Sequence, residues 1–160
     1  MKWSNETKGK YGTVSKFIMA ERLNWTPVDH TSSKGPVFHC ESVVPFEDER
    51  DYKILPNDWP YGLAEGITHI IVWLKTRLES EPIRGDLTEK SRRLVERYIE
   101  KTFVDPLRHL PGSAEEKVMW FRNWTALQSV PGLEHAHVLV RDIPENMILK
   151  WTNGETMKQG

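Results

Sequence analysis

The stretch EHAHVLVRD, residues 134–142, decides the fold because its polar and apolar side chains alternate. Successive side chains of a β-strand point to opposite faces, so His135, His137, Leu139 and Arg141 share one face. The intervening alanine and two valines occupy the other face, which is apolar throughout. The pattern predicts a strand over 135–141 that packs one face on a core and carries histidines on the other.

Further elements are predicted on both sides of this strand. Strands are predicted over 68–75 (THIIVWLK) and 117–124 (KVMWFRNW), with a short one over 37–40. Helices are predicted over 11–23, over 86–103 with Asp86 as N-cap, and over 142–151. Such a mixture is typical of an α+β domain with a mainly antiparallel central sheet and helices packed on it. The length suits a single domain over residues 1–160.

Composition excludes several classes of protein. A net charge of −1 argues against a general nucleic-acid coat, although it leaves room for a local basic patch. One cysteine, Cys40, rules out an internal disulfide framework and a cysteine-rich zinc site. No leader segment and no apolar run long enough to span a bilayer are visible, so we expect no membrane association and a cytoplasmic location.

Histidines form the first candidate site. His69 shares a strand face with Ile71 and Trp73, and would meet His135 and His137 if the two strands were neighbours. Three imidazoles could bind a transition metal, but this sparse spacing is a weak metal signal, so we expect none. Acid–base chemistry and a hydrogen-bonded core are the two readings that stay open, since histidine titrates near neutrality.

Aromatic and polar residues form the second candidate site. The turn NDWPYG, residues 57–62, combines an amide, a carboxylate and two aromatic rings. It is either a capped turn or a ligand-binding loop in which Asp58 meets a cationic group. The chain holds 7 tryptophans, which either fill the core or wall a pocket.

A basic stripe is the third candidate. Lys90, Arg93, Arg97 and Lys101 follow one side of the predicted helix over 86–103. Such a stripe can contact phosphates, but three glutamates interleave with it. A solvated, salt-bridged helix face is therefore the competing interpretation.

Several motifs resemble a mostly fungal family named after an N-acetylglucosamine-induced protein and long described as a domain of unknown function. The motifs are YKILPNDWPYG (52–62), ITHIIVWLK (67–75), GDLTEKSRRLVERYIEKTF (85–103) and KVMWFRNWTALQSVPGLEHAHVLVRD (117–142). Together with YGTVSKFIMAERLNW (11–25), they extend the resemblance over almost the whole chain.

Some members of that family resemble cyclodipeptide synthases that take arginyl-tRNA and a second aminoacyl-tRNA and release an arginine-containing diketopiperazine. The resemblance therefore implies a transferase whose partners are two aminoacyl-tRNAs, with no obligate protein partner. Aminoacyl esters are already activated, so it implies no cofactor. The alternatives are a histidine-ligated metalloenzyme and a non-catalytic module that binds a metabolite.

The resemblance also suggests roles for residues of this chain. A base for the attacking amine would be His69, His135 or His137, and a donor to the ester oxygen would be Asn57, Asn123 or Tyr61. An anion for the guanidinium would be Asp58 or Glu134. The remaining expectations are substrate contacts by Trp59, Tyr61, Trp73, Trp120, Trp124, Ser129 and Arg141, and tRNA contacts by Lys90, Arg93, Arg97 and Lys101.

Overall fold

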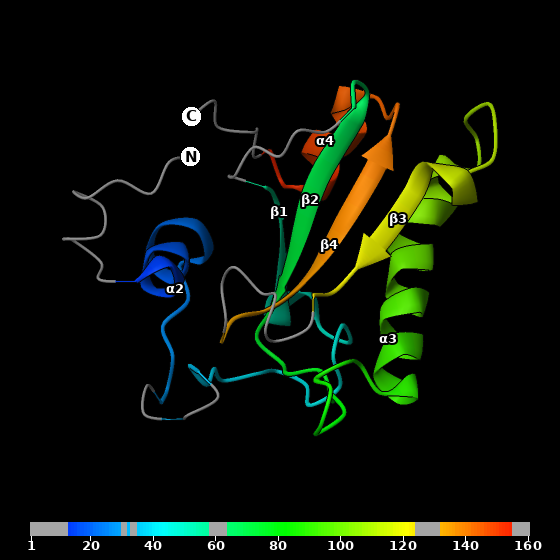
Figure 1. Ribbon diagram of the computed structural model, residues 1–160. Helices are drawn as coiled ribbons and strands as arrows, with labels where there is room; N and C mark the ends of the chain where they lie inside the picture. The colour runs from blue at the N-terminus through cyan, green and yellow to red at the C-terminus, as the bar shows by residue number, and fades with distance from the viewer. Residues whose placement is uncertain (1–12, 30–31, 33–34, 58–63, 124–131, 155–160) are drawn as a thin grey trace.

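A four-stranded antiparallel sheet forms the centre of the molecule (Figure 1). The computed structural model describes residues 13–29, 32, 35–57, 64–123 and 132–154. The strands are β1 (Tyr52–Pro56), β2 (Ile67–Leu74), β3 (Val118–Phe121) and β4 (Glu134–Arg141), in the order β1-β2-β4-β3. The predicted α+β class with an antiparallel sheet is confirmed.

The central pair of strands fixes which side chains share a face. β2 and β4 are antiparallel, with His69 opposite Leu139, Ile71 opposite His137 and Trp73 opposite His135. On the outer side of β4, Phe121 of β3 stands opposite His137. Because side chains opposite one another lie on the same side of a sheet, the histidines and Phe121 share one face, which we call the histidine face.

The opposite face of the sheet, which we call the helix face, is covered by two helices. α3 (Glu89–Ile99) continues as a π-helical segment η3 (Glu100–Val104) and a 3-10 turn η4 (Asp105–Leu107), and α4 (Glu145–Trp151) follows β4. Val95 and Phe103, both fully buried, pack with Ile70, Val72 and Val138 of the sheet. Met147, Ile148 and Trp151 of α4 complete this core.

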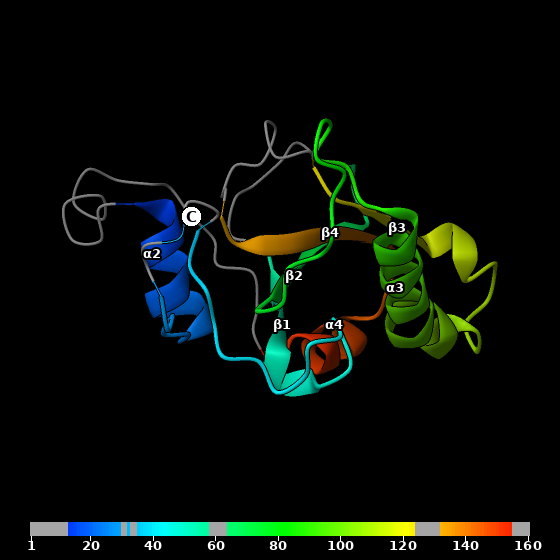
Figure 2. The same cartoon turned by 90° about the horizontal axis from the view of Figure 1, so that it is seen from below.

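Among the described residues, one helical segment packs on the histidine face. α2 (Val14–Phe17) and its π-helical continuation η1 (Ile18–Leu23) bury Phe17, Ile18 and Leu23 against a second hydrophobic cluster. That cluster includes Ile71 and Trp73 of β2. In both views α2 and α3 lie at opposite sides of the sheet (Figures 1 and 2).

Local chemistry explains where the helices begin and end. Asn24 adopts a left-handed conformation, φ 55°, and ends the first helical segment where the sequence predicted. The N-cap of α3 is Thr88, whose Oγ1 accepts from the backbone N–H of Ser91 at 3.2 Å. The expectation that Asp86 caps this helix is therefore wrong, because its carboxylate accepts from the N–H of Leu87 instead.

Other elements also differ from the predictions. The strand predicted over 117–124 ends at Phe121. The strand predicted over 37–40 is only an isolated bridge between Val37 and Asp29. β1 was not predicted, and its Pro56 is tolerated because β1 is an edge strand. The last helix begins at Glu145 rather than at Asp142, which has φ 53°. Two short 3-10 turns, η2 (Glu49–Asp51) and η5 (Glu115–Lys117), precede β1 and β3.

Candidate functional site: a buried histidine cluster

Three histidines converge on the histidine face because β2 and β4 are neighbours. The sequence predicted this convergence only if these two strands were adjacent. Nε2 of His69 and Nδ1 of His137 are 2.9 Å apart and share a hydrogen bond. The ring of His135 lies beside them, with its centroid 5.1 Å from that of His137. The hydrogen bond runs diagonally between strands, since His69 stands opposite Leu139 rather than His137.

Backbone and side chain of Asn57 both hold His69. The Nδ2 group of Asn57, at the end of β1, donates to Nδ1 of His69 at 3.2 Å. The backbone N–H of Asn57 donates to the carbonyl of the same histidine at 3.0 Å. His135 is held separately, because its Nδ1 lies 2.7 Å from the carbonyl oxygen of Leu133. The ring orientations of His69 and His135 are therefore each fixed by a neighbouring amide group.

Burial keeps these rings neutral. His69, His135 and His137 are 4%, 2% and 3% exposed. Loss of solvation lowers the pKa of all three imidazoles. The pKa of His137 falls to about 3, first by burial and then by the positive charge that His135 and His69 would carry. A neutral imidazole can donate one proton and accept another, so the cluster is equipped for proton transfer.

Aromatic rings enclose the cluster on two sides. The ring of Phe121 stacks on that of His137, with 4.6 Å between centroids and 7° between planes. The ring of Trp73 lies 4.8 Å from that of His135 and is itself buried in the second hydrophobic cluster. Phe121 was not among the predicted site residues, although strand alternation places it with Met119. Only the register with β4 shows that it meets a histidine.

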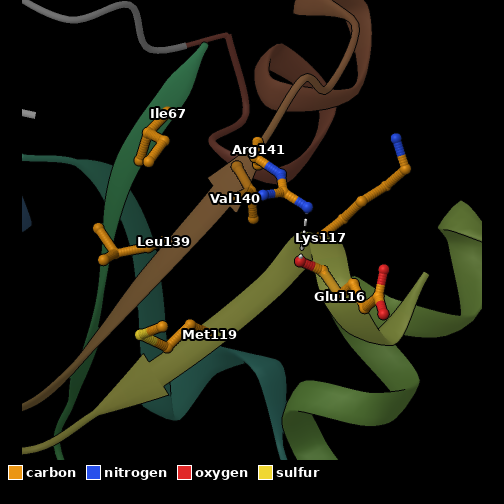
Figure 3. A pocket seen from close by; sticks show the side chains of 7 residues that line it. All are labelled: Ile67, Glu116, Lys117, Met119, Leu139, Val140 and Arg141. Atoms are coloured by element: carbon orange, nitrogen blue, oxygen red, sulfur yellow. Dashed lines mark hydrogen bonds between the residues drawn. The ribbon is translucent and has the colours of Figure 1, made fainter. Parts of the chain in front are cut away.

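A pocket is lined by residues of β2, β3, β4 and η5 (Figure 3). Its apolar part comes from three strands, as Ile67 of β2, Leu139 of β4 and Met119 of β3. Arg141, predicted to contact substrate, lines this pocket and donates to the carbonyl of Glu116 at 3.5 Å. Arg141 therefore lies near the end of the face that is remote from Trp73 and His135.

Two predicted substrate contacts lie on the helix face, away from the histidines. Glu134 forms a buried ion pair with Arg122, Nε to Oε2 3.0 Å, and accepts from the N–H of Leu78 at 2.8 Å. Trp120 packs on the core of that face, with the guanidinium of Arg92 5.6 Å from the centre of its ring. The expectation that Glu134 is available to a cationic ligand is therefore not supported, since its carboxylate already holds Arg122.

The basic stripe lies along the outside of α3 and η3. Lys90, Arg93, Arg97 and Lys101 are all exposed. Nε of Arg93 is 3.2 Å from a carboxylate oxygen of Glu89, and Nζ of Lys90 is 4.0 Å from one of Glu79. Since α3 packs on the helix face, the stripe and the histidine cluster are separated by the sheet.

Some predicted residues lie outside the described part of the chain. These are Asp58, Trp59, Tyr61, Trp124 and Ser129. Asn123 is described and is half-buried just beyond β3. Within the described ranges, no group of three or more His, Cys, Asp or Glu side chains is placed to hold a metal ion. Nor does any helix there have the length and apolar character needed to cross a bilayer.

The fold and the site define an α+β domain with a buried, hydrogen-bonded histidine cluster on one face of an antiparallel sheet. The chain belongs to the family described as "Protein of unknown function (DUF3605)", which matches residues 1–141. This agrees with the resemblance carried by its motifs.

Two curated relatives and one solved structure are similar to the chain. N-acetylglucosamine-induced protein 1 of Candida albicans is 32% identical over 111 residues, which is 68% of this chain and 42% of that protein. The uncharacterized protein YPL067C of Saccharomyces cerevisiae is 26% identical over 139 residues, 87% of this chain and 65% of that protein. The crystal structure of HTC1 matches with a TM-score of 0.58 and 21% identity, covering 97% of this chain and 84% of the other.

These similarities fix the family and the fold. The solved structure, at 21% identity, bears on the fold alone. The chain spans less than two thirds of the length of either curated relative.

Proposed function

We propose that the chain acts in tRNA-dependent cyclodipeptide synthesis, joining arginine from arginyl-tRNA to a second aminoacyl residue to give a diketopiperazine. The observation that carries the proposal is the cluster of His69, His135 and His137, which burial keeps neutral. Its setting between Phe121 and Trp73 suits a reaction that must exclude water, because aminoacyl esters hydrolyse. The resemblance of the motifs supplies the substrate class.

The chemistry requires a proton acceptor rather than an energy source. The α-amine of one aminoacyl residue attacks the ester carbonyl carbon of the other, so an amide C–N bond forms and the ester C–O bond to the ribose breaks. The proton lost by the amine passes to an imidazole nitrogen and then to the departing ribose oxygen. A second attack, by the remaining amine on the remaining ester, closes the ring and releases the second tRNA.

Residues other than the three histidines are the proposed contacts of arginine and of tRNA. Asp58 is the proposed partner of the guanidinium, since the carboxylate of Glu134 is held by Arg122. The exposed stripe of Lys90, Arg93, Arg97 and Lys101 is the proposed phosphate contact. A tRNA that reaches both the stripe and the cluster must pass around an edge of the sheet, because α3 packs on the face opposite the histidines.

Product analysis tests the proposal directly. The chain is expressed in a bacterium, and the medium is searched by mass spectrometry for arginine-containing diketopiperazines. We expect product from the wild-type chain and its loss in His135→Ala and His137→Ala. The matched control is His109→Ala, because His109 is exposed and lies outside the cluster. Circular dichroism checks that each variant remains folded.

Three results would speak against the proposal. Product from an active relative but none from the folded wild-type chain, at equal expression, would reject it. A folded His135→Ala variant with undiminished product would remove the cluster from the mechanism. If the chain binds a metabolite but makes no product, and if Trp59→Ala abolishes that binding while His137→Ala does not, the non-catalytic binding module replaces the synthase.

A further inference from the structure

Asn57 determines which nitrogen donates and which accepts in the hydrogen bonds of His69 and His137. An amide nitrogen can only donate, so the contact between Nδ2 of Asn57 and Nδ1 of His69 makes that ring nitrogen an acceptor. A neutral imidazole carries one proton, and in His69 it must then be on Nε2. This N–H donates to Nδ1 of His137 across 2.9 Å. The proton of His137 is consequently on Nε2.

The chain of hydrogen bonds ends at a group that has no partner. Nε2 of His137 is buried and makes no hydrogen bond within the part of the chain that the structure describes. Buried donors are nearly always paired in folded proteins, because a donor without a partner has lost its hydrogen bonds to water and gained none in return. A buried N–H that stays unpaired, at the end of an ordered chain, is the arrangement expected of a donor kept ready for a ligand.

His135 has the complementary arrangement. Its Nδ1 lies 2.7 Å from the carbonyl oxygen of Leu133, and a carbonyl can only accept, so the proton of His135 is on Nδ1. Its Nε2 is therefore a lone-pair nitrogen. The two rings, 5.1 Å apart between centroids, thus present opposite functions from neighbouring positions on one strand face.

We propose that the two histidines of β4 divide the reaction between them, with Nε2–H of His137 binding a carbonyl oxygen of the ligand and Nε2 of His135 taking the proton. Asn57 and His69 are positioning residues, since they act only by fixing the proton of His137. That the carbonyl belongs to an aminoacyl ester rests on the proposed function, whereas the proton positions do not.

Neutrality is what makes His137 suitable for this role. An imidazole that donates while uncharged stabilises the negative charge developing on a carbonyl oxygen, and it remains in place without gaining a proton from solvent. Burial and the neighbouring rings lower the pKa of His137 to about 3, so it stays uncharged at neutral pH. The same low pKa makes it a poor base there. The assignment of the base role to His135 rests on its bare Nε2, which follows from the contact of its Nδ1 with the carbonyl oxygen of Leu133.

Nitrogen-15 NMR of the histidine side chains tests the proton positions without any substrate. Protonated and bare ring nitrogens resonate far apart, and each couples to the ring carbon-bound protons in its own pattern. In the wild-type protein at pH 7 we expect His69 and His137 to carry the proton on Nε2 and His135 on Nδ1. A bare Nε2 in His137, or a proton on Nε2 of His135, would overturn the proposal.

Asn57→Asp reverses the direction of the chain. A carboxylate can only accept, so His69 should carry a proton on Nδ1, and the proton of His137 should leave Nε2 or be joined by a second. The matched control is Asn146→Asp, because Asn146 is exposed and lies on α4, which packs on the helix face rather than on the histidine face. Unchanged proton positions in folded Asn57→Asp would contradict the assignment. If that variant does not fold, the wild-type spectrum alone decides.

Activity separates this inference from the proposed function. If product forms, His137→Ala should lower kcat by about 10²–10³-fold, as for loss of a carbonyl-oxygen donor. His137→Gln should recover part of that loss, because its amide donates, whereas His135→Gln should recover nothing relative to His135→Ala. Equal kcat for His137→Gln and His137→Ala would reject the donor role. If no product ever forms but the NMR assignment holds, only the proposed function fails.

Discussion

Glu134 on the helix face and His137 on the histidine face are buried polar groups with different hydrogen bonding. On the helix face, the carboxylate of Glu134 receives the N–H of Leu78 and two groups of Arg122, whose third nitrogen donates to the carbonyl of Gly85. On the histidine face, the hydrogen-bond chain through His69 reaches His137 and stops. The first arrangement completes a core, whereas the second leaves an N–H unpaired at a place enclosed by aromatic rings.

This difference distinguishes buried polar groups that stabilise the fold from those that are available for chemistry. A buried charge is tolerated when each of its polar atoms has a partner. Removal of one partner is strongly destabilising, because the other charge is then buried without compensation. A buried ring with an unpaired nitrogen lowers stability, as strained or unsatisfied groups at functional sites do. We therefore expect substitutions on the helix face to act mainly on the free energy of unfolding, and those on the histidine face mainly on pKa and reactivity.

The largest expected effect is loss of the buried ion pair. Glu134→Ala should lower the free energy of unfolding by about 3–5 kcal/mol, because it leaves the guanidinium of Arg122 buried without a counter-charge. Adding Arg122→Met should restore part of this loss, since no buried charge then remains. Urea denaturation measures both, with exposed Glu96→Ala as the control that should change stability by less than about 0.5 kcal/mol. Equal losses in the Glu134 and Glu96 variants would contradict the description of the helix face.

Low pH should lower the free energy of unfolding, because it favours protonation of a histidine on the histidine face. The pKa of His137 is about 3 in the folded protein and near 6.5 when unfolded, so the unfolded chain binds the proton first as pH falls. Stability is therefore full above pH 6.5 and is lost progressively between pH 6.5 and 3. At one pKa unit per 1.36 kcal/mol, the contribution lost by pH 5 is about 2 kcal/mol.

Urea denaturation at pH 7 and pH 5 isolates this contribution. His137→Gln should show a smaller difference between the two pH values than the wild-type protein does, because the titrating ring is gone. His109→Gln should keep the wild-type difference, since that ring is exposed. An undiminished difference in His137→Gln would mean that other groups cause the acid sensitivity.

Removal of the α3 cap should have a moderate effect on the helix face. Oγ1 of Thr88 accepts from the N–H of Ser91, so Thr88→Ala leaves that donor unpaired at the start of the helix. Substitutions of this kind cost about 1 kcal/mol. The midpoint of urea denaturation reports the loss. No shift in the midpoint would show that the first turn of α3 does not depend on this residue.

The smallest expected effect on stability is that of Phe121→Ala. Its ring is 37% exposed and covers His137, so its loss should lower the free energy of unfolding by less than about 1 kcal/mol. Water would then reach His137, and the pKa of that ring should rise above 3 toward its ordinary value. An NMR titration measures the shift, with Met119→Ala on the same strand as control. An unchanged pKa would mean that Phe121 does not shield the ring.

Strand alternation made much of the fold readable from the sequence. The histidines of β4 and the valines between them fall on opposite faces as predicted, because the repeat of two residues is a property of any strand. The buried side of α3 and η3 was equally predictable, since Val95, Tyr98, Ile99 and Phe103 recur at helical spacing. The N-cap prediction was wrong because two nearby residues, Asp86 and Thr88, are both of a type that caps helices. Thr88 is the one that accepts a hydrogen bond from the backbone N–H of Ser91.

The site was less readable, because its decisive contacts lie between strands. That His69 and His137 would meet was conditional on strand order, which no local pattern reveals. The position of Asn57 beside His69 depends on the register of β1 and β2, and the pairing of Glu134 with Arg122 depends on that of β3 and β4. Residue types pointed to proton chemistry, but only the three-dimensional arrangement distinguishes a donor ring from an acceptor ring.

The strand order also has a consequence for how the protein folds. β1 with β2, and β3 with β4, are hairpins that form from neighbouring segments, whereas β2 and β4 must find each other across the crossover that contains α3. Such long-range pairing is slow compared with local hairpins, because a long loop must close first. His69 and His137, 68 residues apart, join only at this step. Their hydrogen bond therefore appears only when the two hairpins dock, so a chain emerging during synthesis holds no assembled site until its last strand is in place.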